Sequence, residues 1–424
     1  MLKEFRVANF KSIRNEQTFT MEACSKNEVS EYPDHVVEKG GNRLLKVASI
    51  YGPNGGGKSN LFKALNTFAL ISLSKPVLND SLKEENYFPC VFCKNKNTTF
   101  TLFFITDDYE IGYTIEVDLN NIIQSLNPAS NSYIYLLDYK IEKEEMVARP
   151  LDKEDFRTLY KRDRNGIVVS EDIGDIDLIR NKTPLSKNNT FINYYCSTFG
   201  LSNNNILAKP LFEFSQELSS YVLLKKETMV LRFLKHDVDH LTQYLEKTRE
   251  ALNVLDFRIE KLYFKEVESG IYYLYIVRKA SDGAYTEIPL QNESKGTIKA
   301  INIVLLILFR SNIQLVIGDD FDSFLHPKLI RVIIELFTSK DNNSKQLIIN
   351  SHDMTNMNNK VFRRDEIWFA YRDDDYSTIY QPLSNIVDYK GNMVRKDAVY
   401  GKQYLEGRYG ADPFIEKGLR WNND

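Results

Sequence analysis

A glycine-rich loop between an apolar strand and a helix constrains this chain more than any other feature of its sequence. The stretch YGPNGGGKSN, residues 51–60, fits the pattern G-x-x-x-x-G-K-[ST]. The preceding residues 44–51, LLKVASIY, predict a short buried strand, and residues 58–73 carry apolar side chains at helical spacing. Strand, glycine loop and helix, in this order, form the context that the pattern requires.

The loop predicts a site for the phosphate groups of a nucleotide. Glycines allow a tight turn whose backbone N–H groups point at phosphate oxygens, and the next helix adds the positive end of its dipole. Lys58 is expected to reach the β- and γ-phosphates, and the Ser59 hydroxyl to ligate Mg²⁺. The alternative is a glycine-rich turn without a ligand. We expect ATP to contact the whole loop, which comprises Gly52, Pro53, Asn54, Gly55, Gly56, Gly57, Lys58, Ser59 and Asn60.

Two adjacent carboxylates follow a second apolar strand. In LVIGDDFDSFLHP, residues 315–327, the strand delivers Asp319 and Asp320 at its carboxyl end. Ligands of open α/β sheets bind at that edge. We expect Asp319 to hold the magnesium through water, and Asp320 to position and polarise the attacking water. The alternative is an acidic turn after a buried strand.

A histidine and a polar turn complete the set of candidate residues. In QLIINSHD, residues 346–353, a third apolar strand ends before His352, which can contact a γ-phosphate and report its presence. A lone histidine is more often structural, but its position on the next strand after the carboxylates favours the functional interpretation. Residues 291–309, QNESKGTIKAINIVLLILF, place a polar turn before an apolar helix. Alone, this turn indicates only a helix N-terminus capped by Ser or Thr.

Composition excludes several classes of protein. The 424 residues are 43% hydrophobic and 27% charged, which suffices for a core and argues against wholesale disorder. A net charge of −3 gives no global basic field that would indicate nucleic acid. Four cysteines are too few for a disulfide scaffold, and we interpret Cys90 and Cys93 as two thiols rather than a zinc site. The longest apolar run has nine residues, and no signal peptide is apparent, so we expect a cytoplasmic location without membrane contact.

Four segments are expected along the chain. Residues 1–75 hold the glycine loop, residues 76–160 a β-rich subdomain, residues 161–285 an insertion with a helical arm and strands, and residues 286–424 the carboxylates and His352. In more detail, the sequence predicts strands over 2–22, a hairpin over 98–118, strands near 133–140 and 144–149, loops over 160–205, helices over 210–255, strands over 257–277, helices at 296–310 and 327–338, and strands at 313–318, 346–350, 366–372 and 377–383.

Together these pieces resemble the head of ATP-binding-cassette ATPases. More narrowly, they resemble the RecF/SMC/OLD-like branch of AAA-family ATPases, labelled AAA15 or AAA21. LKEFRVANFKSI is similar to the start of that branch, GPNGGGKSN to its Walker A motif, ESKGT to its signature, DDFDSFLHP to its Walker B motif and D-loop, and SHD to its switch histidine. The tail KDAVYGKQYLEGRYGADPF resembles the ending found in bacterial phage-defence and abortive-infection ATPases. The resemblance covers residues 1–70 and 285–415 well and the middle loosely.

The resemblance implies a fold and a mechanism between two protomers. The fold is an α/β P-loop ATPase head of ABC type, with a mixed sheet, an antiparallel β-subdomain and a mixed, partly helical insertion. Two protomers sandwich two ATP molecules, and the signature residues Ser294, Lys295 and Gly296 of one protomer cap the γ-phosphate that Lys58 of the other holds. ATP then joins the dimer, and hydrolysis releases it.

Two residues depart from that family pattern. Asp320 stands where the family usually has glutamate, and an aspartate is one methylene shorter. We therefore predict slow turnover and a long-lived ATP-bound state. No glutamine lies between Gln17 and Gln124, so the Q-loop glutamine is not at its expected place.

The expected function is that of an ATPase subunit in a bacterial anti-phage or abortive-infection system. The ATP-dependent dimer or higher oligomer would control a separate effector, a nuclease, because this sequence has five histidines and no nuclease signature of its own. One alternative is a DNA-repair ATPase of the RecF/SMC type, with nucleic acid as a partner. A second is an ATP-binding sensor or scaffold with little hydrolysis. A transporter cassette is disfavoured by the long insertion and the missing glutamine.

Overall fold

A five-stranded sheet forms the centre of the computed structural model. The structure describes residues 1–24, 32–78, 88–93, 96–127, 132–170, 186–199, 211–213, 215, 233–309, 315–387 and 391–411. The central sheet has the order β17-β18-β5-β19-β20. Its first four strands run parallel, and the last is antiparallel. The strands are β5 (Val47–Tyr51), β17 (Leu315–Gly318), β18 (Gln346–Asn350), β19 (Ile367–Arg372) and β20 (Thr378–Pro382).

Helices cover both faces of this central sheet. Strand β5 alternates between them, because Ala48 and Ile50 belong to one buried cluster and Val47 and Tyr51 to another. Helix α2 (Lys58–Ser72) contributes to the first cluster, whereas α8 (Lys295–Phe309) and α9 (Pro327–Thr338) contribute to the second. Among the described helices, none is long and apolar enough to cross a membrane.

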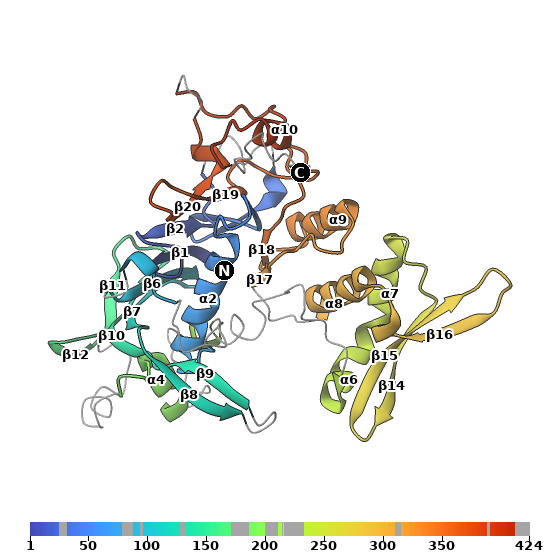
Figure 1. Cartoon of the computed structure of the whole chain (residues 1–424), viewed down its shortest axis with the longest axis horizontal. Helices are drawn as coiled ribbons and strands as arrows, with labels where there is room; N and C mark the ends of the chain where they lie inside the picture. The colour runs from blue at the N-terminus through green and yellow to red at the C-terminus, as the bar shows by residue number, and fades with distance from the viewer. Residues whose placement is uncertain are drawn as a thin grey trace, which may run out of the picture.

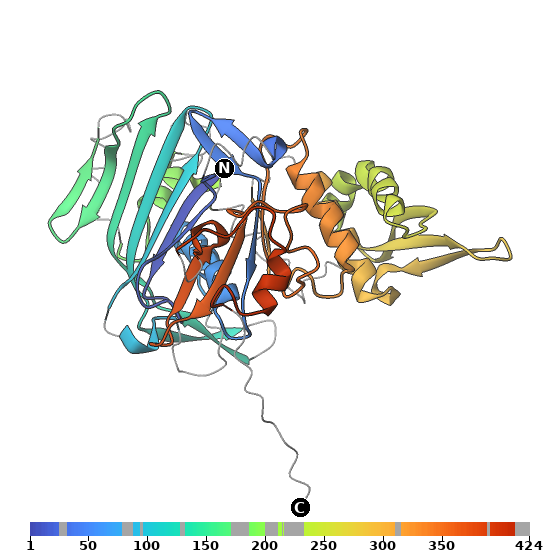
Figure 2. The ribbon, with the colours of Figure 1, turned by 90° about the horizontal axis from the view of Figure 1, so that it is seen from above.

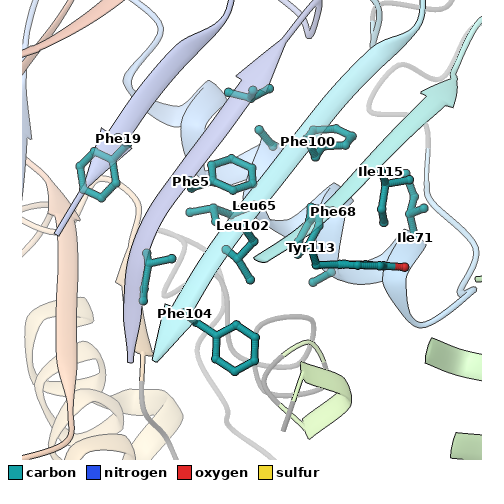
Figure 3. Close-up of a cluster of buried hydrophobic side chains, with 14 of the residues drawn as sticks. Phe5, Phe19, Leu65, Phe68, Ile71, Phe100, Leu102, Phe104, Tyr113 and Ile115 are labelled. Carbon is teal, nitrogen blue, oxygen red and sulfur yellow. The ribbon is translucent and has the colours of Figure 1, made fainter. Parts of the chain in front are cut away.

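A seven-stranded antiparallel sheet packs on the other side of α2 (Figures 1 and 2). Figure 3 shows Phe5, Phe100 and Tyr113 of this sheet beside Phe68 of α2. One apolar cluster thus joins both sheets through the helix that follows the glycine loop. The order is β12-β11-β10-β7-β6-β1-β2, with β1 (Leu2–Ala8), β2 (Gln17–Thr20), β6 (Thr98–Ile105), β7 (Tyr109–Asp118), β10 (Lys140–Pro150), β11 (Arg157–Asp163) and β12 (Gly166–Val169).

Residues 233–289 form a separate layered unit, which we call the arm. Figure 1 shows it at the right of the molecule, joined to the rest through α8. A small antiparallel sheet has its apolar face against helices α6 and α7. Its elements are β13 (Phe233–Leu234), α6 (Lys235–Leu241), η4 (Thr242–Tyr244), α7 (Leu245–Val254), β14 (Lys261–Glu268), β15 (Ile271–Lys279) and β16 (Tyr285–Pro289).

Short elements complete the described part of the chain. Two small hairpins pair β3 with β4 and β8 with β9. The bounds are β3 (Val36–Lys39), β4 (Asn42–Leu45), β8 (Ile122–Asn127), β9 (Ser132–Leu137), α4 (Phe191–Phe199), α10 (Tyr400–Leu405), η1 (Pro33–His35), η2 (Val91–Cys93), η5 (Leu290–Asn292) and η6 (Leu383–Asn385).

The α/β class, with a mixed sheet and an antiparallel β-subdomain, is confirmed. Three local predictions were wrong. The strand predicted over 44–51 is divided at Lys46 into β4 and β5. The loops predicted over 160–205 include β12 and α4, which the many polar residues of this stretch concealed. The helices predicted over 210–255 are interrupted by β13, and residues 216–232 lie outside the described part.

Candidate nucleotide-binding site

The glycine loop lies directly against β19 and β20, which leaves no room for a side chain at Gly52 or Gly57. Gly52 and Gly57 have φ angles of 148° and 104°, in the region that favours glycine. A Cβ on Gly52 would lie 2.0 Å from the Ala370 carbonyl oxygen, and one on Gly57 would lie 2.2 Å from Thr378 Oγ1. The sequence of this loop therefore follows from how closely the two strands approach it.

Three side chains from the same two strands hold the carbonyl groups of the loop. Arg372 Nε donates to the Gly55 oxygen at 2.8 Å, Thr378 Oγ1 to the Gly56 oxygen at 3.1 Å, and the Tyr380 hydroxyl to the Gly57 oxygen at 2.7 Å. The amides of Gly56 and Asn60 donate to the carbonyl oxygens of Pro53 and Gly57, whereas the other amides at the helix entrance have no backbone acceptor among the described residues. These donors, available for phosphate oxygens, belong to Gly55, Gly57, Lys58 and Ser59.

Lys58 is a buried cation surrounded by oxygens. Its side chain is only 6% exposed, and its Nζ donates to the carbonyl oxygens of Gly52 at 2.8 Å and Pro53 at 3.0 Å. Desolvation lowers the pKa of Lys58, and the negative charges of Asp320, Asp322 and Asp319, in that order, partly oppose this shift. The ammonium group of Lys58 thus lies between the loop carbonyls and the carboxylates.

Ser59 and Asp319 meet although 260 positions separate them in the chain. Ser59 Oγ donates to Asp319 Oδ1 at 2.7 Å, and Asn350 Nδ2 donates to the same oxygen at 2.5 Å. A serine hydroxyl beside a carboxylate fits a magnesium ion that Ser59 would ligate and Asp319 would hold through water. Asn350 would orient the carboxylate from outside.

Asp320 and His352 lie at the same edge of the sheet. Asp320 is half-buried, has a φ of 48°, and donates its amide proton to Asn350 Oδ1. His352 is exposed, and its amide donates to Asp322 Oδ2 at 2.8 Å, beside the amide of Asp353 at 2.9 Å. The aspartate and histidine thus follow the neighbouring strands β17 and β18, as the sequence predicts.

The signature turn lies apart from these residues. Ser294 caps α8, since its Oγ accepts a hydrogen bond from the Thr297 amide at 3.1 Å. A Cβ on Gly296 would lie 2.6 Å from the Phe324 carbonyl oxygen, and Lys295 Nζ lies 5.1 Å from the centre of the Phe324 ring. Their described contacts are with the D-loop region and not with the glycine loop of the same chain. The structure therefore does not bring Ser294, Lys295 and Gly296 to Lys58 within one protomer.

Several residues at the site were not found from the sequence. Asn350 joins the two aspartates, and Lys299 Nζ donates to the oxygens of Asp320 at 3.0 Å and Ser323 at 3.1 Å. The sequence offered a signal for both, since each is a polar residue in an apolar segment. Asn350 ends an apolar strand, and Lys299 interrupts an apolar helix. None existed for the side chains that hold the loop carbonyls, Arg372, Thr378 and Tyr380.

A family model matches most of this chain. Residues 47–358 match a family model described as "AAA domain, putative AbiEii toxin, Type IV TA system". The match begins at strand β5 and ends after His352, so it includes the glycine loop, the signature turn and both aspartates.

Two solved structures are also similar. The SMC head domain from Thermotoga maritima is 14% identical, with a TM-score of 0.37 over 90% of this chain and 98% of that one. A structure of an SMC head bound to the C-terminal winged-helix domain of ScpA is 12% identical, with a TM-score of 0.40 over 90% of this chain and 96% of that one. No curated protein matches significantly. Since the family model covers well over half of the sequence, this chain belongs to the AAA_21 family of AAA-domain ATPases.

Proposed function

We propose that this protein binds and hydrolyses ATP as the ATPase subunit of a bacterial defence system. The observation that carries the proposal is the meeting of Ser59, Asp319 and Lys58 at one sheet edge. A serine hydroxyl, a carboxylate and a buried ammonium group are the side chains that bind a nucleoside triphosphate together with magnesium.

Each residue has a role that follows from its position. The free amides of the loop and Lys58 bind the β- and γ-phosphates, and Ser59 and Asp319 hold Mg²⁺. Bound Mg²⁺ would supply positive charge to the phosphate oxygens. Asp320 accepts a proton from the attacking water, and exposed His352 contacts the γ-phosphate from the next strand.

We further propose that ATP joins two protomers. The Ser294–Gly296 turn at the N-terminal end of α8 is partly exposed, and its described contacts include no phosphate-binding residue of its own chain. In a dimer, this turn would complete the site of the partner, and both sites would close together. The Asp320→Asn variant should retain ATP and accumulate as a dimer. Light scattering with and without ATP measures this, and a variant that remains monomeric at saturating ATP contradicts the dimer.

The defence role rests on the family description, which names a toxin and a type IV toxin–antitoxin system. The ATP-dependent assembly would hold or release a separate effector, which we expect to be a nuclease. The test is a pull-down of the tagged protein expressed with its chromosomal neighbours in ATP, beside Lys58→Ala. A nuclease-like protein that associates differently with the two forms supports the proposal. Recovery of the chain with DNA alone contradicts it and favours a repair-type ATPase.

A second candidate is a sensor that binds ATP with little hydrolysis. The short carboxylate of Asp320 at the water position favours it. Phosphate release measured alongside binding of a fluorescent ATP analogue distinguishes the two functions. Binding with no release above that of Lys58→Ala supports the sensor.

A further inference from the structure

The arm carries a face of alternating tyrosine and lysine side chains, on which the lysines are exposed and most of the tyrosines are partly exposed. Strands β14, β15 and β16 pair so that Tyr263 lies opposite Tyr275, Lys265 opposite Tyr273, and Lys279 opposite Tyr285. Residues that face each other across neighbouring strands lie on the same side of a sheet. We call this side the tyrosine–lysine face, which comprises Lys261, Tyr263, Lys265, Tyr273, Tyr275, Val277, Lys279, Tyr285 and Glu287.

The opposite side of the same sheet accounts for its folding. Leu262, Leu274 and Ile276 are buried in the cluster that includes α7. The tyrosines of the tyrosine–lysine face belong to none of the described buried clusters. Figure 2 shows α6 and α7 on one side of the sheet. The aromatic residues on the other side are therefore not needed to build the core.

The side chains on this face are ordered into aromatic and cationic pairs. Tyr263 and Tyr275 stack with ring centres 5.6 Å apart. Lys261 lies 5.5 Å from the centre of the Tyr263 ring and Lys265 lies 5.2 Å from that of Tyr275. Tyr285, which is 63% exposed, has Lys279 at 5.8 Å. Ring faces and ammonium groups thus alternate over three adjacent strands.

Charge on the face is positive although the whole chain is acidic. Three lysines oppose one carboxylate, Glu287, and the hairpin end adds Glu266 and Glu268 outside the face. A protein core would not require lysines between the rings, and an acidic partner without rings would not require the tyrosines. A polyanion with flat bases uses both, because bases stack on aromatic rings and phosphates pair with lysines.

We propose that the tyrosine–lysine face of the arm binds single-stranded nucleic acid. Bases stack on the tyrosines, and the phosphates between them contact Lys261, Lys265 and Lys279. Duplexes are excluded as the main ligand, since their bases are already stacked. The chemistry is shared by RNA and DNA. The proposed site lies on the arm and not at the glycine loop, so its binding can be measured without ATP.

Fluorescence anisotropy of the full chain without ATP tests the proposal. The probes are fluorescein-labelled oligomers of deoxythymidine and of uridine, about 16 nucleotides long. The variants are Lys261→Ala/Lys265→Ala/Lys279→Ala and Tyr263→Ala/Tyr275→Ala. A matched control removes three exposed lysines elsewhere, as Lys153→Ala/Lys340→Ala/Lys402→Ala. Circular dichroism and binding of an ATP analogue verify that each variant folds.

We expect both face variants to lose affinity by about tenfold or more, and the control to bind like the wild type. Removal of three lysines should also reduce the salt slope of the logarithmic affinity by about 2. The preferred probe identifies RNA or DNA as the ligand. The proposal is overturned if the wild type binds no better than the lysine variant, if the control loses as much, or if the tyrosine variant binds like the wild type. If the face variants bind the oligonucleotides like the wild type but lose a protein that co-purifies with the wild type, the face is a protein contact instead.

Discussion

At the scale of single residues, Lys58 illustrates how the site is poised. Two carbonyl oxygens bind its ammonium group, and three aspartates lie near it. A phosphate must compete with these carbonyls, which are neutral and therefore weaker acceptors than an anion. The lysine can thus turn toward a phosphate without losing a strong ion pair.

Lengthening the carboxylate at position 320 should accelerate hydrolysis. Asp320→Glu brings the carboxylate one methylene closer to the attacking water, and we expect the ATPase rate to rise by about tenfold. Phosphate release at saturating ATP measures this rate. Asp320→Asn is the control and should be inactive, and an unchanged rate in Asp320→Glu would mean that the aspartate is already well placed.

Removing the amide that joins the two aspartates should weaken magnesium binding. Asn350→Leu leaves Asp319 without the 2.5 Å donor that orients it. Loss of such outer partners lowers metal affinity by about 10–100-fold. The Mg²⁺ concentration that half-saturates ATP hydrolysis should rise accordingly, whereas binding of the ATP analogue without metal should stay the same. A half-saturation point equal to that of the wild type would refute the orienting role.

These residues also mark what a sequence can reveal. Lys58, Ser59 and Asp319 were predictable because each follows a strand at a fixed local spacing. Thr378 and Tyr380 were not, because they hold loop carbonyls from 322 and 323 positions away. No motif near Thr378 or Tyr380 in the sequence indicates a contact with the glycine loop, since the pattern there is that of an ordinary strand.

At the scale of elements, the glycine loop depends on the strands that support it. Gly57→Ala introduces a Cβ within 2.2 Å of Thr378 Oγ1 at a φ of 104°. Gly55→Ala is the matched control, since its φ is 77° and no atom lies within 4 Å of the added Cβ. The control should lose about 1–2 kcal/mol of unfolding free energy, and Gly57→Ala about 1–3 kcal/mol more. Urea unfolding measures both, and equal losses would argue against a tight contact with β20.

Arg278 connects the arm to the signature turn. Its Nε donates to Glu293 Oε1 at 2.9 Å, and its NH1 donates to the Phe257 carbonyl oxygen. Glu293 directly precedes Ser294. Arg278→Gln should therefore weaken ATP-dependent dimerisation by about tenfold while analogue binding is retained. Arg331→Gln, which removes an exposed arginine on α9, is the control. Sedimentation velocity reports the dimer, and equal behaviour of both variants would contradict the connection.

Elements differed in how well the sequence indicated them. Helix α9 begins and ends at the predicted residues, because Pro327 occupies its first turn and Leu329, Ile330, Ile333 and Ile334 bury one face. Strand β11 has few apolar residues, and β12, at the edge of the seven-stranded sheet, buries only Val169. Side chains of an edge strand are less buried, so the alternation of apolar and polar residues along its sequence is weak.

At the scale of the whole molecule, a buried ion pair ties the N-terminal segment to the central sheet. Arg363 and Asp365 are 0% and 4% exposed and share two hydrogen bonds of 2.8 and 2.6 Å. The Cys24 amide also donates to Asp365 at 2.9 Å. Desolvation would raise the pKa of Asp365, but the bonds and charge of Arg363 outweigh it and lower that pKa below its ordinary value. The carboxylate is therefore charged throughout the neutral range.

Asp365→Asn should cost about 3–5 kcal/mol of unfolding free energy at neutral pH, because it removes the carboxylate that pairs with buried Arg363. Since the folded pKa is lowered, the folded chain binds fewer protons than the unfolded chain as pH falls below about 4. The wild type then loses the stability that the variant never had, and the difference between them narrows. Urea unfolding along a pH series measures it. If the difference in unfolding free energy between wild type and variant grew toward acidic pH, the pKa of Asp365 would be raised and not lowered in the folded chain.

The position of β5 has a consequence for how the protein is made. Its two parallel neighbours, β18 and β19, are residues 346–350 and 367–372. At about 5–20 residues per second, the ribosome needs roughly 15–60 seconds after β5 to produce them. During this time both edges of an apolar strand are open, and neither Asp319 nor Asn350 exists for much of it. Nascent chains are therefore prone to aggregation, and they cannot bind nucleotide with metal until synthesis is nearly finished. We expect a chaperone to bind them during this time.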